Sequence, residues 1–179
     1  MFSRLKEKKG TKQLEKRLRY FKRNVVFHNV ENTKTLGILY KYESNHSADF
    51  ISKLFQEFSS FGIKCEAIGY YDEKNLPLEY APKTSHIVIC QADLMWSGVP
   101  KAEEVERYVN DEYDILLDLS RSDKLVFKYI ASLSKAQFKI GSIRYEKDPY
   151  DLVFIANSNS DQSFVDQVFQ FLGSIKPAN

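Results

Sequence analysis

Cysteine is scarce in this sequence. Only Cys65 and Cys90 are present, too few for a disulfide framework. Both lie in stretches that are typical of strands, GIKCEAIG and IVICQAD, so we expect buried, reduced thiols rather than a redox pair. No apolar run approaches the length of a membrane span, and the amino-terminal MFSRLKEKKG lacks the apolar core of a secretion signal. These absences favour a cytoplasmic protein.

The usual signatures of catalysis and cofactor binding are also missing. There is no GxGxxG or GxxxxGKS/T loop to cradle a phosphate, and no GxSxG nucleophile elbow. The three histidines stand apart, without the spacing of a metal site. His86 opens an apolar strand and is interpreted as a hydrogen-bonded structural residue. We therefore expect no catalytic residue, no metal and no cofactor; a protein that is not an enzyme is favoured, with the question left open.

Apolar residues, by contrast, are plentiful. They make up 43% of the 179 residues and include 13 Phe and 11 Tyr, which excludes a disordered chain and allows a sizeable core. Runs typical of strands occupy residues 35–40, 63–70, 85–90, 113–119, 136–144 and 152–157. Amphipathic patterns typical of helices occupy residues 47–61, 100–110 and 160–175, with another around Leu125–Leu133.

This alternation predicts an α/β fold, a three-layer sandwich around a mostly parallel sheet of about six strands. Apolar and polar residues alternate at 136–144, so the face that carries Lys139 is expected to be polar. Only the seven residues YEKDPYD precede the last run, too few for a helical crossover. The last strand is therefore expected to be antiparallel, near an edge. Ser47 is the expected N-cap of the helix after the first strand, and Gly62 its C′ residue.

The amino-terminal segment differs from the rest in charge. Residues 1–24 hold ten Lys and Arg against two Glu, a net charge of +8, whereas the remaining 16 basic and 22 acidic side chains give −6. We therefore expect two parts: a basic helical arm, residues 1–28, followed by a single α/β domain, residues 29–179.

Residues 12–23 of this arm have the pattern of a basic amphipathic helix. Their narrow apolar stripe consists of Leu14, Leu18, Phe21 and, beyond them, Val25. Thr11 is its expected N-cap, since Gly10 interrupts or starts the helix. The stripe can dock on the domain, which leaves the cations facing solvent or an anionic partner such as RNA, a ribonucleoprotein or DNA. The candidate partner-binding residues are Lys8, Lys9, Lys12, Lys16, Arg17 and Arg19.

A second candidate site follows from the strand ends, where open α/β sheets bind ligands. The segment DLSRSDK, residues 118–124, places two hydroxyls and Arg121 at a helix start that can hold a phosphate or carboxylate. The simpler interpretation, which we favour, is helix capping alone. Ser120 and Asp123 then form a capping box, or Ser122 acts as the cap.

The segment QADLMWSGVP, residues 91–100, puts the only tryptophan in a loop after an apolar strand. Asp93 can face Asp118 across adjacent strand ends, with Met95 and Trp96 as a lid over a flat ligand. The alternative, which we favour, is that the two large side chains plug the end of the sheet. The candidate pocket comprises Asp93, Trp96, Asp118, Ser120, Arg121 and Ser122.

Five features occur together along the chain: a Lys/Arg-rich first helix, a GILY strand, LLDLS before an amphipathic helix, FKIG, and a YDLVF strand before the last helix. With them the chain resembles, over nearly its whole length, a family of small uncharacterised α/β proteins from Bacteroidetes, a domain of unknown function. The resemblance implies a single cytoplasmic domain in a bacterial setting and carries no functional residue.

Three functional hypotheses follow. The favoured one is a non-enzymatic interaction module that presents the basic helix to an anionic partner. The alternative is a small-molecule enzyme or ligand-binding protein with its pocket at the strand ends. Membrane-surface association through the arm is the least favoured, because the apolar stripe is narrow.

Overall fold

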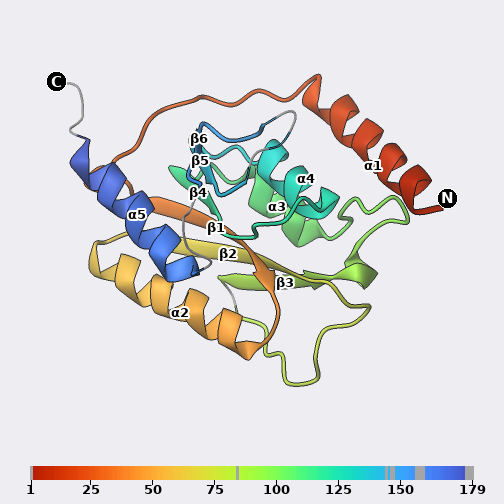
Figure 1. Ribbon diagram of the computed structural model, residues 1–179, viewed down its shortest axis with the longest axis horizontal. Coiled ribbons are helices and arrows are strands. Elements are labelled where there is room, and N and C mark those ends of the chain that lie inside the picture. The colour runs from red at the N-terminus through yellow and green to blue at the C-terminus, as the bar shows by residue number, and fades with distance from the viewer. Residues whose placement is uncertain (1, 84, 144, 146–147, 156–159, 176–179) are drawn as a thin grey trace.

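Helices flank a central sheet in this protein (Figure 1). A computed structural model describes residues 2–83, 85–143, 145, 148–155 and 160–175, so residues 156 and 157 of the last expected strand lie outside the described residues. The helices are α1 (Phe2–Leu18), α2 (Asn45–Ser60), α3 (Glu103–Asn110), α4 (Leu125–Leu133) and α5 (Asp161–Ser174), with a 3₁₀ turn η1 (Gln91–Asp93). The strands are β1 (Thr35–Tyr42), β2 (Lys64–Tyr71), β3 (His86–Cys90), β4 (Ile115–Asp118), β5 (Phe138–Gly141) and β6 (Leu152–Val153).

The six described strands form one parallel sheet in the order β3-β2-β1-β4-β5-β6. The chain builds β2 and β3 on one side of β1 and then returns to add β4, β5 and β6 on the other, as in doubly wound α/β sheets. The carboxyl ends of β1 and β4 are therefore neighbours from which the chain departs to opposite sides. Sheets of this kind bind ligands at such a switch point.

Both faces of the sheet are covered, which gives the expected three layers (Figure 1). Neighbouring residues of a strand point to opposite faces. Leu39 and Leu116 belong to the core under α1, α3 and α4, whereas Ile38 and Leu117 belong to the core under α2 and α5. Among the described residues, no helix combines the length and the apolar character that a membrane crossing requires.

The expected antiparallel strand is wrong, because β6 pairs parallel with β5. β5 ends at Gly141, so residues 142–151 form the connection, and ten extended residues reach about 30 Å, more than twice the length of β5. A parallel return therefore needs no helix. The return lies close against β5: the Asp151 N–H donates to the Lys139 carbonyl at 2.9 Å, and a β-carbon on Gly141 would overlap the ring of Tyr150.

α2 begins three residues earlier than expected. Ser44 is its N-cap and accepts a hydrogen bond from the His46 N–H at 3.3 Å. Ser47 instead completes a capping box from the N3 position, by accepting from the Ser44 N–H at 3.2 Å. Gly62, with φ of +75°, occupies the position expected for it after the C-cap Phe61.

α1 also begins earlier than expected, so Thr11 lies inside the helix and is not its N-cap. The sequence interpretation treated Gly10 as a break, but this glycine has a packing role. It is buried where α1 crosses the Ser97 carbonyl and the Leu125 side chain, and a β-carbon at this position would overlap both. Close contact of the two backbones therefore explains a glycine in mid-helix.

The polar face expected for residues 136–144 is also wrong, because Lys139 is only 1% exposed. Its ammonium donates to the carbonyls of Ala131 at 2.7 Å and Ser132 at 3.1 Å, and so satisfies the carboxyl end of α4. Phe21 covers it, with the ammonium 5.2 Å from the ring centre. Burial, helped by repulsion from Arg23, lowers the pKa of Lys139 from 10.5 to about 7.

β3 is an edge strand, and the loop that precedes it occupies its outer side. The Val88 N–H donates to the Tyr80 hydroxyl at 3.1 Å, and Lys83 forms an isolated antiparallel bridge with His86. The buried imidazole of His86 bonds to the Tyr40 hydroxyl, and burial lowers its pKa to about 4. These contacts agree with the structural role expected for His86.

Candidate functional site

α1 docks on the helical layer through its apolar residues. Leu14 is 2% exposed, and Leu18 and Phe21 are half-buried against the same core. Val25 is 57% exposed and does not continue the stripe, because the helix ends at Leu18. The apolar stripe formed by Leu14, Leu18 and Phe21 therefore packs against the domain.

Among the candidate partner-binding cations, Arg17 takes part in this docking through hydrogen bonds. Arg17 donates to Glu106 at 2.9 Å and to the Tyr129 hydroxyl at 2.5 Å, which ties α1 to α3 and α4. The hydrogen bond from Arg17 lowers the pKa of the Glu106 carboxyl. Nearby, Ser97 Oγ donates to Gln13 Oε1 at 2.6 Å. Arg17 is thus engaged within the protein, a role that charge counting does not reveal.

The other five candidate cations are exposed, and none forms an ion pair with a described residue. We call them the α1 cationic face: Lys8, Lys9, Lys12, Lys16 and Arg19. Lys8, Lys12 and Lys16 are spaced by four residues and so share one side of the helix, and Arg19, one residue beyond its end, continues the spacing three residues on. Like charges at such spacings destabilise a helix by roughly 0.2–0.5 kcal/mol per pair. Docking must offset this repulsion.

The loop of residues 94–100 forms the platform beneath the first turns of α1. The Met95 N–H donates to the Val99 carbonyl and the Gly98 N–H to the Met95 carbonyl, both at 2.8 Å, and Gly98 has φ of +81°. This tight turn holds Met95 and Trp96 outward, 46% and 55% exposed. The expectation that they plug the sheet is therefore wrong. The ammonium groups of Lys9 and Lys6 lie 5.3 and 5.9 Å from the centre of the Trp96 ring.

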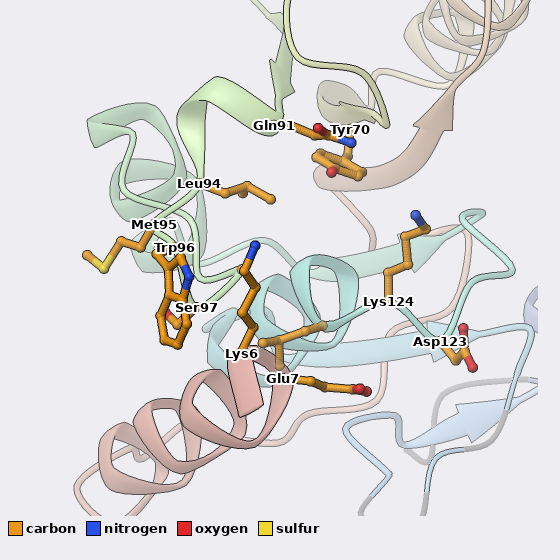
Figure 2. Close-up of a pocket in the computed structure, with 12 residues that line it drawn as sticks. Lys6, Glu7, Tyr70, Gln91, Leu94, Met95, Trp96, Ser97, Asp123 and Lys124 are labelled. Carbon is orange, nitrogen blue, oxygen red and sulfur yellow. The ribbon is translucent and has the colours of Figure 1, made fainter. Parts of the chain in front are cut away.

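A cavity of about 610 Å³, which we call the α1 cleft, opens between the start of α1, the platform and the strand ends. Figure 2 shows Trp96 and Leu94 on one side, Lys124 on the other, and Lys6 pointing between them. Tyr70 and Gln91, from the ends of β2 and β3, close the far end (Figure 2). Their positions after apolar strands are a usable sequence signal, but nothing in the sequence places Lys6 opposite them.

A second cavity, of about 420 Å³, lies at the switch point between β1 and β4. Ser120, Arg121 and Ser122 line it, as the strand-end hypothesis predicts. The favoured capping interpretation does not hold, since Lys124 is the N-cap of α4 and no side chain caps it. Arg121 has φ of +47°, an uncommon value for a residue with a side chain, and donates to the Ser160 carbonyl at 2.8 Å.

The cations at this switch-point pocket are all matched by carboxylates. Lys41 pairs with Glu43 at 2.5 Å, and Arg121 lies 3.4 Å from Asp161. Lys124 pairs with Asp72. Burial opposes the charge of Asp72, but the hydrogen bonds from Lys124 and Tyr70 outweigh it and lower the pKa of the carboxyl. The lining is therefore close to neutral.

The two aspartates of the predicted pocket do not meet, because β2 and β1 separate β3 from β4. Asp93 instead accepts a hydrogen bond from the Cys90 N–H at 2.9 Å. Asp118 is 2% exposed and accepts from the Tyr150 hydroxyl and, at 2.7 Å, from the Ser120 N–H. Burial raises the pKa of Asp118, and both carboxylates act within local structure.

Fold and sites define an α/β protein with a doubly wound parallel sheet and an amino-terminal helix docked on one face. The chain belongs to a family of unknown function, DUF6913, whose sequence profile matches residues 6–175. The expected Bacteroidetes source gains no support from this match. No curated protein and no solved structure matches the chain.

Proposed function

We propose that this protein is a non-enzymatic module that binds the phosphate backbone of a nucleic acid along the α1 cationic face. The supporting observation is the position of these five cations, four on α1 and Arg19 one residue beyond it, next to the apolar residues Leu14 and Leu18 that are already used for docking. Helical spacing gathers three of them on one side, where each can neutralise a phosphate and release its counterion. The negative charge of the remaining chain keeps nonspecific contacts away from other surfaces.

Membrane-surface association fits the same charges less well. An interfacial helix inserts an apolar face beside its cations. In α1, Leu14 and Leu18 are buried or half-buried against the protein itself, and the single exposed leucine, Leu5, does not make a face. A small anionic ligand at the switch-point pocket is also not favoured, since the three cations there already have carboxylate partners.

A matched pair of charge variants tests the proposal. One variant replaces Lys8, Lys12, Lys16 and Arg19 with Gln. The control replaces four exposed cations outside α1 with Gln and so removes the same amount of positive charge as the first variant. These four residues are Lys34, Lys53, Lys64 and Lys74. Arg17 and Lys9 are kept because they contact Tyr129 and Trp96.

Fluorescence anisotropy with 20-nucleotide RNA and DNA, over a salt series, gives the readout. Four lost phosphate contacts reduce the slope of log K against log salt by about 3, at roughly 0.7 per contact for single strands. The control variant keeps the parent slope. Equal slopes in both variants would contradict the proposal, as would binding of the parent only to anionic vesicles. Comparison of the RNA and DNA titrations shows which of the two backbones the protein prefers.

A further inference from the structure

We infer that the α1 cleft receives an unpaired base of a single-stranded nucleic acid, stacked on Trp96. This inference rests on the proposed function and names its substrate class. Nonspecific single-strand binders combine a cationic track for the backbone with exposed aromatic rings on which bases stack. Both parts occur together here, at the start of α1.

The first step of the argument is the exposure of Trp96. An indole is one of the largest apolar side chains and normally contributes most when it is buried. Trp96 is 55% exposed, on a turn fixed by two backbone hydrogen bonds and a glycine in the left-handed region. A rigid loop that presents a large ring to solvent is suited to stacking, because little conformational entropy is lost on binding.

The second step is the position of cations around the ring. Lys6 and Lys9 place ammonium groups within 5.9 Å of the indole centre. A base that stacks on Trp96 brings its flanking phosphates to the same place, where these ammonium groups can pair with them. Lys9 also continues into the α1 cationic face, so the backbone track and the stacking platform are continuous.

The third step is the cleft itself, whose volume of about 610 Å³ is within the usual range for small-molecule sites. Its far wall carries Gln91, whose amide is held by donation from Nε2 to the Asp72 carbonyl at 3.0 Å. A fixed side-chain amide can hydrogen-bond the edge of a base. On the side opposite Trp96, Lys124 is already paired with Asp72, and the carboxylates Glu7 and Asp123 also line the cleft (Figure 2). The cations that can pair with phosphates are therefore Lys6 and Lys9 beside the indole.

A second exposed ring lies at the other end of α1. Tyr20, two residues beyond the helix, is 83% exposed. Eleven residues separate it from Lys9, a distance of about 16 Å at the helical rise. A single strand can therefore follow the cationic face with a stacking ring at each end. Bases within a duplex are already stacked on each other and cannot use these rings.

The tryptophan provides the test, because Trp96 is the only one in the chain and its fluorescence reports on this site alone. The full chain is titrated with a 20-nucleotide single-stranded RNA or DNA and with the duplex of the same sequence. We expect quenching of Trp96 by single strands and at least tenfold tighter binding of single strands than of duplex. Equal affinity without quenching would overturn the inference.

Matched aromatic variants complete the experiment. Trp96→Leu should weaken single-strand binding about tenfold or more while duplex binding changes less than twofold, and Trp96→Phe should recover part of the loss. The control is Phe61→Leu, which removes an equally exposed ring at the carboxyl end of α2, on the other face of the sheet. It should change neither affinity.

The two failures can be told apart. If no nucleic acid binds the parent protein, the proposed function and the inference both fall. If nucleic acid binds through the α1 cationic face but Trp96→Leu binds like the parent, only the inference falls. If circular dichroism shows that Trp96→Leu does not fold, the quenching of Trp96 fluorescence in the parent protein by single strands decides whether the inference holds.

Discussion

The α1 cleft and the switch-point pocket both lie at the carboxyl ends of strands of one sheet, both are lined by cations and carboxylates, and Lys124 belongs to both linings. They differ in whether those cations form ion pairs with carboxylates. At the switch point Lys41, Arg121 and Lys124 each have a carboxylate within 3.4 Å or less. Beside the α1 cleft, Lys6 and Lys9 lie over an exposed indole, and the cationic face behind them forms no ion pair with a described residue.

Strand topology and charge therefore favour different sites in this protein. The topology favours the switch point, as in other doubly wound sheets. An anion that enters the switch-point pocket must displace carboxylates that already pair with its three cations, so little net attraction remains. An anion that approaches α1 displaces only water and counterions. The following predictions test this comparison.

The largest expected effect concerns the contact that forms the cleft. Gly10→Ala should destabilise the protein by about 2 kcal/mol, because the new methyl group overlaps the Ser97 carbonyl and Leu125. Gly173→Ala is the control: nothing lies within 4 Å of a β-carbon in that α5 position, so helix propensity should stabilise by about 0.5–1 kcal/mol. Urea unfolding measures both. Stabilisation by both substitutions would show that α1 is not closely docked at Gly10.

Lys139 represents a third environment for a cation, because it is buried from solvent and forms no salt bridge with a carboxylate in the described part of the chain. Its pKa of about 7 lies below the ordinary 10.5, so between these values the unfolded chain binds more protons than the folded protein. Stability should therefore rise with pH in this window, by up to about 1.4 kcal/mol per unit.

The measurement is urea unfolding at pH 7 and pH 8.5, below the range where tyrosines titrate; the two thiols, with ordinary pKa values of about 8.5, are present in the parent and in the reference variant alike and cancel in the comparison. Lys139→Met is the reference, since it removes the titrating group. Its lower overall stability, from unsatisfied α4 carbonyls, does not matter because the slope is the readout. A parent slope no steeper than that of Lys139→Met would mean that Lys139 keeps an ordinary pKa.

At the switch-point pocket, the carboxylate of each ion pair can be neutralised by substitution while the cations are kept. In the triple variant Glu43→Gln, Asp72→Asn, Asp161→Asn, the three cations lose their partners. Millimolar inorganic phosphate should then stabilise the variant by about 1 kcal/mol and the parent not at all, as measured by thermal unfolding. Stabilisation of the parent to the same extent would show that the pocket already accepts anions.

The smallest effect separates two neighbouring arginines of the arm. Arg17→Gln should cost about 0.5–1 kcal/mol of stability, because it loses Glu106 and Tyr129, and should leave RNA affinity nearly unchanged. Arg19→Gln should have the opposite profile, with stability retained and RNA affinity reduced about twofold or more. If both variants lose only affinity, Arg17 belongs to the binding surface.

Local patterns of the sequence are sufficient for much of the fold. Apolar runs locate the strands, and Gly62 marks the end of α2, because both signals depend on neighbouring residues. The pairing of Asp93 with Asp118 was wrong because strand order is a nonlocal property, and two strands separate β3 from β4. Lys139 was placed on a polar face because its partners are carbonyls of another element.

The candidate sites show the same limit. Helical spacing is enough to propose the α1 cationic face, and the position of Trp96 after a strand is enough to propose a site at its loop. The loop's platform role depends on contact with Gly10, more than eighty residues earlier in the chain. Arg17 carries the same charge as its neighbours, and only its distant partner Glu106 distinguishes it.

The covered edge of β3 has a consequence for the behaviour of the protein at high concentration. A bare sheet edge offers unpaired amides that can recruit a strand from another molecule, which is how many proteins aggregate or form fibres. The Tyr80 hydroxyl and Lys83 already occupy the outer side of β3, and the opposite edge, β6, is only two residues long. Among the described residues, neither edge of the sheet presents a long bare strand, so β-augmentation by another molecule is disfavoured.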